Sequence, residues 1–224
     1  MKKRKWFLIG AVLIEILDVK APPSQSRFPL YDSLYKQSQM NLLFAARGKF
    51  DENNFDNFSW EKYKDWSKIY QLDELVSLDG ILNEDLIEPD YDNEEDWNNI
   101  HVVDLVQTGF YNNIEYILRK ISTKNKFNLL AVEIEPNEEC SNLIVEDYEF
   151  IGYDLLDQDF AISALSNCGG FDESFLPTEL NNKGLIDNLE KAKNIQEKLL
   201  ENNPKEHHAD TNVIAVWRHF KIGR

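Results

Sequence analysis

Residues 185–200, LIDNLEKAKNIQEKLL, and residues 212–220, NVIAVWRHF, carry the two clearest patterns in this chain. The first run has apolar side chains at the spacing of one helical face, and Asn202-Asn203-Pro204 then predicts the end of the helix. The second run predicts a strand with one apolar side, formed by Val213, Ala215 and Trp217. We therefore expect Leu189 and Ile195 of the helix to face a sheet.

Upstream of these runs, the patterns predict more strands and one more helix. Residues 128–135, 148–156 and 160–166 read as strands, and Asp157-Gln158-Asp159 reads as a hairpin turn between the last two. Apolar residues recur at helical offsets over residues 113–121. Because strands and helices do not alternate regularly, we expect the α+β class, with helices packed on a mixed or antiparallel sheet. No linker divides the chain, so residues 1–224 are predicted to form a single domain.

The first 70 residues add two predicted helices and an ambiguous N-terminus. Residues 29–47 and 60–70 read as helices, the second with an aromatic stripe typical of a core face. Basic residues 1–5 precede an apolar run, which resembles the start of a secretory signal. Glu15 and Asp18 interrupt that run, and it is far shorter than the roughly 20 residues that span a bilayer. We favour one long buried strand over residues 6–17, with the signal as the alternative.

The net charge and the cysteine count of this chain argue against several classes of protein. Its 24 basic and 40 acidic residues give a formal net charge of −16, which disfavours binding to nucleic acid. Only two cysteines are present, so a disulfide-stapled scaffold is excluded. Residues 51–100 hold 3 basic and 16 acidic residues, and we interpret residues 71–100 as an acidic, partly irregular insert of the domain.

The densest acidic run, residues 88–96, is the predicted partner-binding site. A solvated loop explains such a run, and so does a docking face, since a field of one sign speeds association with an opposite charge. We therefore expect a cytoplasmic protein that docks a basic protein partner, for example an immunity protein or an inhibitor of a cationic toxin. The predicted contacts are five carboxylates and two aromatic anchors: Asp90, Tyr91, Asp92, Glu94, Glu95, Asp96 and Trp97.

The alternative function is a cysteine-dependent hydrolase. Cys168 precedes Gly169-Gly170, and a later His207 or His208, with Asp210, supplies the residue types of a base and its orienting group. A turn with a buried cysteine explains the same residues. Cys140 is a poor nucleophile because it follows Glu138 and Glu139.

Metal and cofactor sites lack support in the sequence. Asp90 begins a run with the alternating carboxylates of a calcium loop, but Glu95 replaces the required Gly and His101 replaces the final Glu. Asp154, Asp157 and Asp159 form either a carboxylate cluster or a turn with exposed aspartates. Motifs for ATP, dinucleotides and zinc proteases are missing, so no metal and no cofactor is expected.

Overall fold

The computed structural model describes residues 5–9, 12–16, 43–48, 72–79, 93–103, 108–111, 113–121, 127–157, 160, 162–166, 179–206 and 209–222. Side chains are described for these residues except in the two N-terminal ranges and at 48, 97–98, 100–103 and 108–109. All statements below concern this part of the chain.

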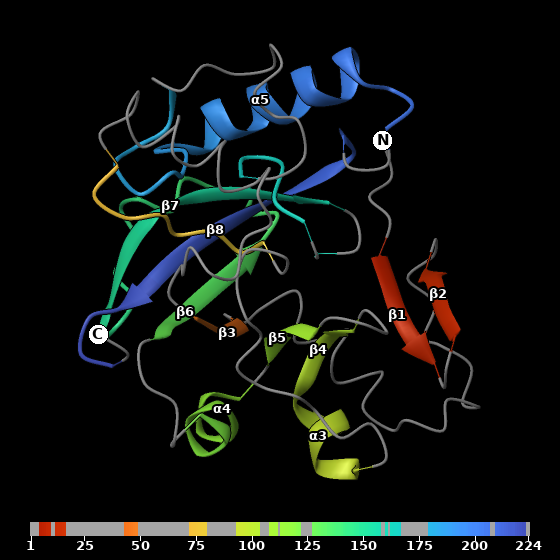
Figure 1. Cartoon of the computed structure of the whole chain (residues 1–224), viewed down its shortest axis with the longest axis vertical. Helices are drawn as coiled ribbons and strands as arrows, with labels where there is room; N and C mark the ends of the chain where they lie inside the picture. Colours follow the sequence, from red (N-terminus) through yellow and green to blue (C-terminus); the bar gives the residue numbers. More distant parts are fainter. Residues whose placement is uncertain are drawn as a thin grey trace, which may run out of the picture.

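A six-stranded antiparallel sheet forms the centre of the described structure (Figure 1). Its strand order is β4-β5-β3-β6-β8-β7, and every neighbouring pair runs antiparallel. Within the described residues, the chain therefore combines an antiparallel sheet with a few helices, in keeping with the expected α+β class. The strands are β3 (Leu43–Gly48), β4 (Ile100–Val103), β5 (Thr108–Tyr111), β6 (Phe127–Ile134), β7 (Tyr148–Asp157) and β8 (Thr211–His219).

Helix α5 (Leu189–Asn202) covers one face of the sheet over β7 and β8 (Figure 1). It begins four residues later than the sequence suggests, because Ile186 is extended and pairs with Tyr153 of β7. The Asn188 side chain caps the helix by accepting from the Lys191 N–H at 2.9 Å. The expected orientation of this helix is confirmed, since its buried face packs with Val213, Ala215 and Trp217 through Leu189, Ala192, Ile195 and Leu199.

Residues 72–79 cover the opposite face without forming a helix or a strand. Val76 and Leu78 are buried there in one cluster with Ile214 and Val216 of β8. The backbone N–H groups of Asp73 and Val76 donate to the carbonyls of Asn182 and Lys183, at 2.8 and 2.9 Å. This part of the acidic segment is thus irregular in backbone but fixed in place.

Two short helices lie at the other end of the sheet (Figure 1). In α4 (Ile114–Lys120), the buried residues Tyr116 and Ile117 pack against Tyr111 of β5 and Leu129 of β6. Helix α3 (Glu94–Asn99) begins after Asn93, whose side chain accepts from the Glu95 N–H at 2.9 Å. The acidic segment therefore contains a capped helix as well as irregular chain.

Three sequence predictions are corrected by the structure. Residues 43–47 belong to strand β3 and not to a helix over 29–47. The N-terminal apolar run forms an antiparallel hairpin of β1 (Lys5–Ile9) and β2 (Val12–Ile16), and not one long central strand. Residues 160 and 162–166, the described part of the predicted strand, form no strand, although Ser163 makes an isolated bridge to Leu156 of β7.

Two remaining observations complete the fold. The helix predicted over residues 60–70 and most of the one predicted over 29–47 lie outside the described residues. None of the helices in the described ranges has the length and apolarity that a membrane-spanning helix needs.

Candidate functional site

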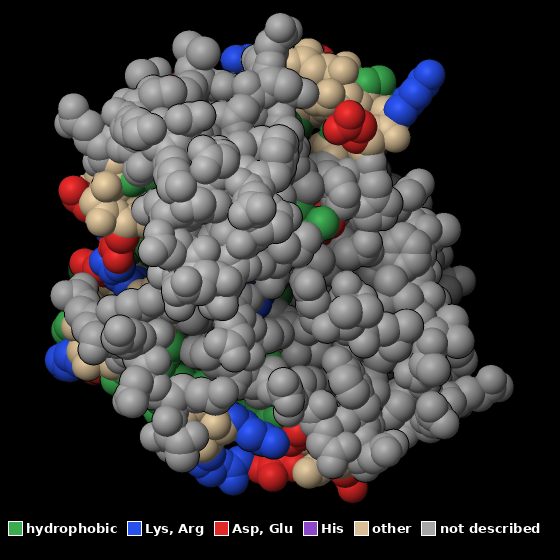
Figure 2. Space-filling model, in the orientation of Figure 1, with side chains coloured by type: hydrophobic (Ala, Val, Ile, Leu, Met, Phe, Trp, Pro, Cys, Tyr) green, Lys and Arg blue, Asp and Glu red, His purple; other side chains and the backbone are tan. Residues whose placement is uncertain are grey.

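The predicted docking residues on α3 have two different surroundings. Glu94 and Glu95 are exposed, and Glu95 forms an ion pair with Arg119 of α4. Asp96 is completely buried, and Lys120 Nζ lies 3.0 Å from its carboxylate. Figure 2 shows red and blue side chains lying together at the bottom of the view, where Figure 1 places α3 and α4. Asp96 is thus not the exposed carboxylate that the sequence indicates, because it is used to hold α3 against α4.

The other predicted docking residues are not described at the level of their side chains. Asp90, Tyr91 and Asp92 lie outside the described residues, and Trp97 lies in α3 with its side chain outside them. Contact of these residues with a partner stays a prediction, as it does for Glu94 and Glu95.

The alternative hydrolase site also falls mostly outside the described chain. Cys168, His207 and His208 are not described, and Asp210 is half-buried with interactions of its own. His219 is buried, and its Nδ1 accepts from the backbone N–H groups of Lys221 and Ile222, at 3.1 and 3.0 Å. Burial lowers its pKa. His219 is therefore a structural residue at the end of β8, with Nδ1 already occupied.

The predicted carboxylate cluster near residue 157 is not an exposed turn. Asp154 and Asp157 are both buried, which corrects that interpretation. Asp154 accepts hydrogen bonds from Ser163 Oγ at 2.5 Å and from the Leu78 N–H at 2.9 Å. Burial raises the pKa of Asp154, while these hydrogen bonds oppose the rise.

The Asp154 carboxylate is part of a larger buried polar cluster. Ser77 and Ser166 are joined by a 2.7 Å hydrogen bond between their hydroxyls, and the Ser163 N–H donates to Asp79 at 2.9 Å. The cluster joins residues 77–79 to the chain that follows β7. Within the described ranges, no group of three His, Cys, Asp or Glu residues could hold a metal ion.

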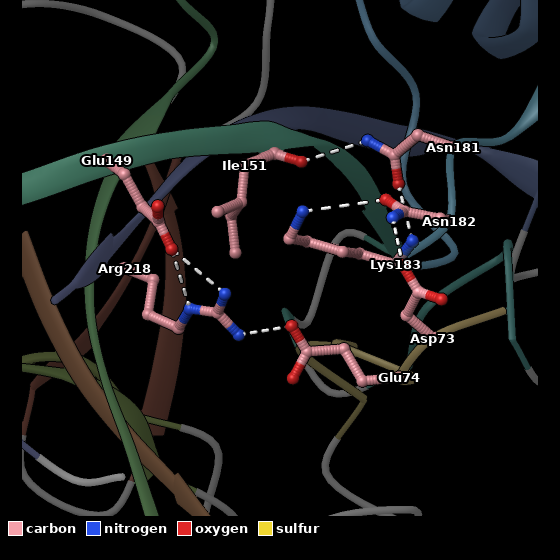
Figure 3. A network of polar contacts seen from close by, with 8 residues as sticks. All are labelled: Asp73, Glu74, Glu149, Ile151, Asn181, Asn182, Lys183 and Arg218. Carbon is pink, nitrogen blue, oxygen red and sulfur yellow. Dashed lines mark hydrogen bonds and ion pairs between the residues drawn. The ribbon is translucent and has the colours of Figure 1, made fainter.

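A second polar network fixes the edge of the sheet (Figure 3). Arg218 donates to Glu149 through Nε and Nη2, at 3.2 and 2.9 Å, and also pairs with Glu74. Burial alone would lower the pKa of Arg218, but its hydrogen bonds to these two carboxylates raise it. Asn181 donates to the Ile151 carbonyl at 3.0 Å in the same view. The guanidinium of Arg218 is therefore neutralised by the protein's own carboxylates.

The loop between β6 and β7, residues 135–147, presents a feature that the sequence analysis missed. Ile144 is 98% exposed and Leu143 is 40% exposed, although both are large apolar residues. Glu138 and Glu146 in the same loop are exposed as well. In the sequence, the only sign of this feature is a short apolar run between Glu138-Glu139 and Glu146-Asp147. That pattern does not distinguish an exposed loop from a buried strand.

Glu139 attaches this loop to the rest of the fold. Its carboxylate accepts from the Tyr153 hydroxyl at 2.7 Å, from the Leu189 N–H at 2.8 Å and from the Ser141 N–H at 3.0 Å. Partial burial would raise the pKa of Glu139, but these donors lower it. Burial, together with nearby carboxylates, raises the pKa of Cys140 to about 11, as expected for a poor nucleophile.

No family model matches the chain, and no curated protein and no solved structure is similar enough to it to inform its function.

Proposed function

We propose that this chain is an acidic binding protein that docks a basic protein partner in the cytoplasm through its single α+β domain. One concrete version is an immunity protein or inhibitor that covers the active surface of a cationic toxin such as a nuclease. Nuclease surfaces are basic because they bind phosphates, so an acidic inhibitor is complementary to them.

The surface charge carries this proposal. Among the side chains that the structure describes, twelve exposed carboxylates stand against six exposed basic groups. Three of those six, Arg119, Lys120 and Lys221, are already paired with carboxylates. The exposed acidic residues are Asp73, Glu94, Glu95, Glu115, Glu138, Glu146, Glu149, Asp187, Glu190, Glu197, Glu201 and Glu206, and the remaining basic ones are Lys193, Lys198 and Lys205.

The places of the charged groups in the fold support a role for the excess negative charge in binding. Two of the charged groups that are buried in the fold have partners of opposite charge, Asp96 with Lys120, and Arg218 with Glu74 and Glu149. The exposed carboxylates of α5 and of the β6–β7 loop are not needed for such pairs. They are therefore available to attract a basic surface and to speed its association.

A salt-dependent capture experiment tests the proposal. The chain is immobilised and exposed to lysate of its native host at about 50 mM and about 200 mM salt, because exposed charges are screened over about 8–10 Å near the higher value. We expect a basic protein to be retained at low salt and released at high salt. For an inhibitor, adding the chain also suppresses the nuclease activity of the retained protein.

The matched control is a variant with Asp90→Asn, Asp92→Asn, Glu94→Gln and Glu95→Gln. Asp96 stays unchanged, because it is the buried partner of Lys120. The variant should fold, and its association rate with the retained protein should fall and lose most of its salt dependence. If wild type retains no basic protein at either salt concentration, the proposed function is wrong. If wild type and variant associate at equal rates, residues 90–95 are not the docking face.

A further inference from the structure

The three large apolar side chains that are exposed in the described part of the chain come from neighbouring segments. They are Leu143 at 40%, Ile144 at 98% and Phe220 at 41% exposure. The Phe220 N–H donates to the Asp147 carbonyl at 3.1 Å, and Lys221 Nζ lies 2.5 Å from the Asp147 carboxylate. The β6–β7 loop and the end of β8 are therefore bonded side by side, and we call Leu143, Ile144 and Phe220 the apolar tip.

The apolar tip is held in place by hydrogen bonds and buried anchors. The Leu143 N–H donates to the Cys140 carbonyl at 3.0 Å, and the Tyr148 N–H donates to the Val145 carbonyl at 3.1 Å. These two turns lie on either side of Ile144. Cys140 is fully buried, and Val145 packs against the core beneath α5. Because the loop is already ordered, a partner that binds Ile144 loses little conformational entropy in fixing it.

Exposed carboxylates lie close in sequence to Leu143 and Ile144, whereas Lys221 Nζ lies 5.2 Å from the centroid of the Phe220 ring. Glu138 and Glu146 are exposed in the same loop, and neither takes part in an ion pair that would cancel its charge among the described side chains. An ordered apolar residue surrounded by polar and charged groups is the arrangement found at the centres of protein interfaces. The charges around this one select for a partner of the opposite sign.

We infer that the apolar tip is a second contact surface of the protein, besides the acidic residues 90–95, and that Ile144 inserts into an apolar pocket bordered by Lys and Arg on a basic protein partner. This inference rests on the proposed function and adds to it an apolar contact. A second copy of this chain is a poorer occupant, because each copy carries a net charge of −16.

The experiment places a photo-crosslinking residue, benzoylphenylalanine, at position 144 of the full chain in its native host. Parallel chains carry it at Glu94 on α3 and at Lys198, an exposed position of α5. Proteins that crosslink at position 144 are identified and purified, and their dissociation constants are measured with wild type, Ile144→Ala and Lys198→Ala. Ile144→Ala should leave the unfolding temperature unchanged, since the side chain is 98% exposed.

The expected result is a basic protein that crosslinks at position 144 and not at 198. Ile144→Ala should raise its dissociation constant about tenfold or more, whereas Lys198→Ala should change it less than about twofold. No adduct at 144, an adduct with a second copy, or equal dissociation constants would overturn the inference. A basic protein captured only at Glu94 would also overturn it and leave the proposed function standing. An acidic partner at 144 would overturn both.

Discussion

Gly152 lies at a position of β7 that does not accommodate a side chain. Its φ is +135°, a backbone conformation that residues with a Cβ rarely adopt, and the register with β8 shifts between Phe150 and Gly152. A Cβ placed there would lie 2.7 Å from the Leu185 Cβ and 3.0 Å from the Ile186 carbonyl oxygen. The close approach lets Ile186 pair with Tyr153 of β7.

Gly152→Ala should therefore lower the free energy of unfolding by about 2–4 kcal/mol. Urea denaturation of the variant and of wild type measures this difference. An unchanged midpoint would mean that β7 does not need the positive φ to pair with Ile186.

Glu139 makes stability depend on pH in a direction that follows from its contacts. The folded pKa is lowered by three donors, so the ionised form stabilises the fold. This contribution is fully present above the unfolded pKa of about 4.3, and it is lost as pH falls through the lower folded value. Protonation would weaken the attachment of the β6–β7 loop to Tyr153 and to the start of α5.

Glu139→Gln should cost about 1–2 kcal/mol of stability at neutral pH, because charge-assisted hydrogen bonds are replaced by weaker ones. Unfolding of both proteins is measured from about pH 7 down to about pH 3, across the ordinary pKa of Glu. The difference between them should shrink as pH falls. A difference independent of pH would show that shape, and not charge, fixes the loop.

At the level of elements, α3 and α4 are joined by two ion pairs that should contribute unequally to the stability of the fold. The Lys120–Asp96 pair has one buried member, whereas Arg119 and Glu95 are 64% and 53% exposed at their side chains. Removing Lys120 leaves a buried carboxylate without its cation, and removing Arg119 leaves a solvated one. Because Arg119 and Lys120 are adjacent in α4, variants at these two positions can be compared directly.

Lys120→Met should destabilise the protein by about 1–3 kcal/mol, and Arg119→Met by less than about 0.5 kcal/mol. Thermal unfolding of the two variants under one buffer condition measures the contrast. Equal losses would mean that Asp96 is stabilised without Lys120.

The elements with the strongest local patterns could be predicted from sequence. α4, β6, β7, α5 and β8 all lie within a few residues of their predicted positions. Strand β3 could not, because Leu43-Phe44-Ala45-Ala46 suits a helix locally, and only pairing with β6 makes it a strand. The pairing of β1 with β2 could not be predicted, because residues 6–17 are apolar at alternating positions on both sides, a pattern typical of one long buried strand.

The candidate sites were less predictable, since exposure depends on the whole fold. Nothing near Asp96 in sequence shows that Lys120 lies against it. Ile144 was missed because a single apolar residue in a loop looks the same in sequence whether it is buried or exposed. Residues 72–79 belong to a segment that the sequence predicts to be acidic and partly irregular, and only the fold shows that Val76 and Leu78 are part of the core.

On the scale of the whole molecule, unbalanced charge opposes folding. With a net charge of −16, the folded chain brings carboxylates closer together than the unfolded chain does. Raising the salt concentration from about 10 mM to about 150 mM shortens the screening length from about 30 Å to about 8 Å.

We therefore expect the unfolding temperature to rise with salt over this range. Differential scanning calorimetry measures it, with a neutral osmolyte at matched osmolarity as the control. A fall in unfolding temperature would show that attraction within the ion pairs outweighs the general repulsion.

The place of β8 in the sheet sets the order in which the chain can fold as it is synthesised. β8 lies between β6 and β7, yet it is translated after both of them. Until residues 211–219 leave the ribosome, β6 and β7 have no strand between them, and the apolar face of α5 has no β8 to pack on. At about 5–20 residues per second, several seconds separate the synthesis of β7 from that of β8. Nascent chains paused before residue 211 should thus bind chaperones and be open to proteases.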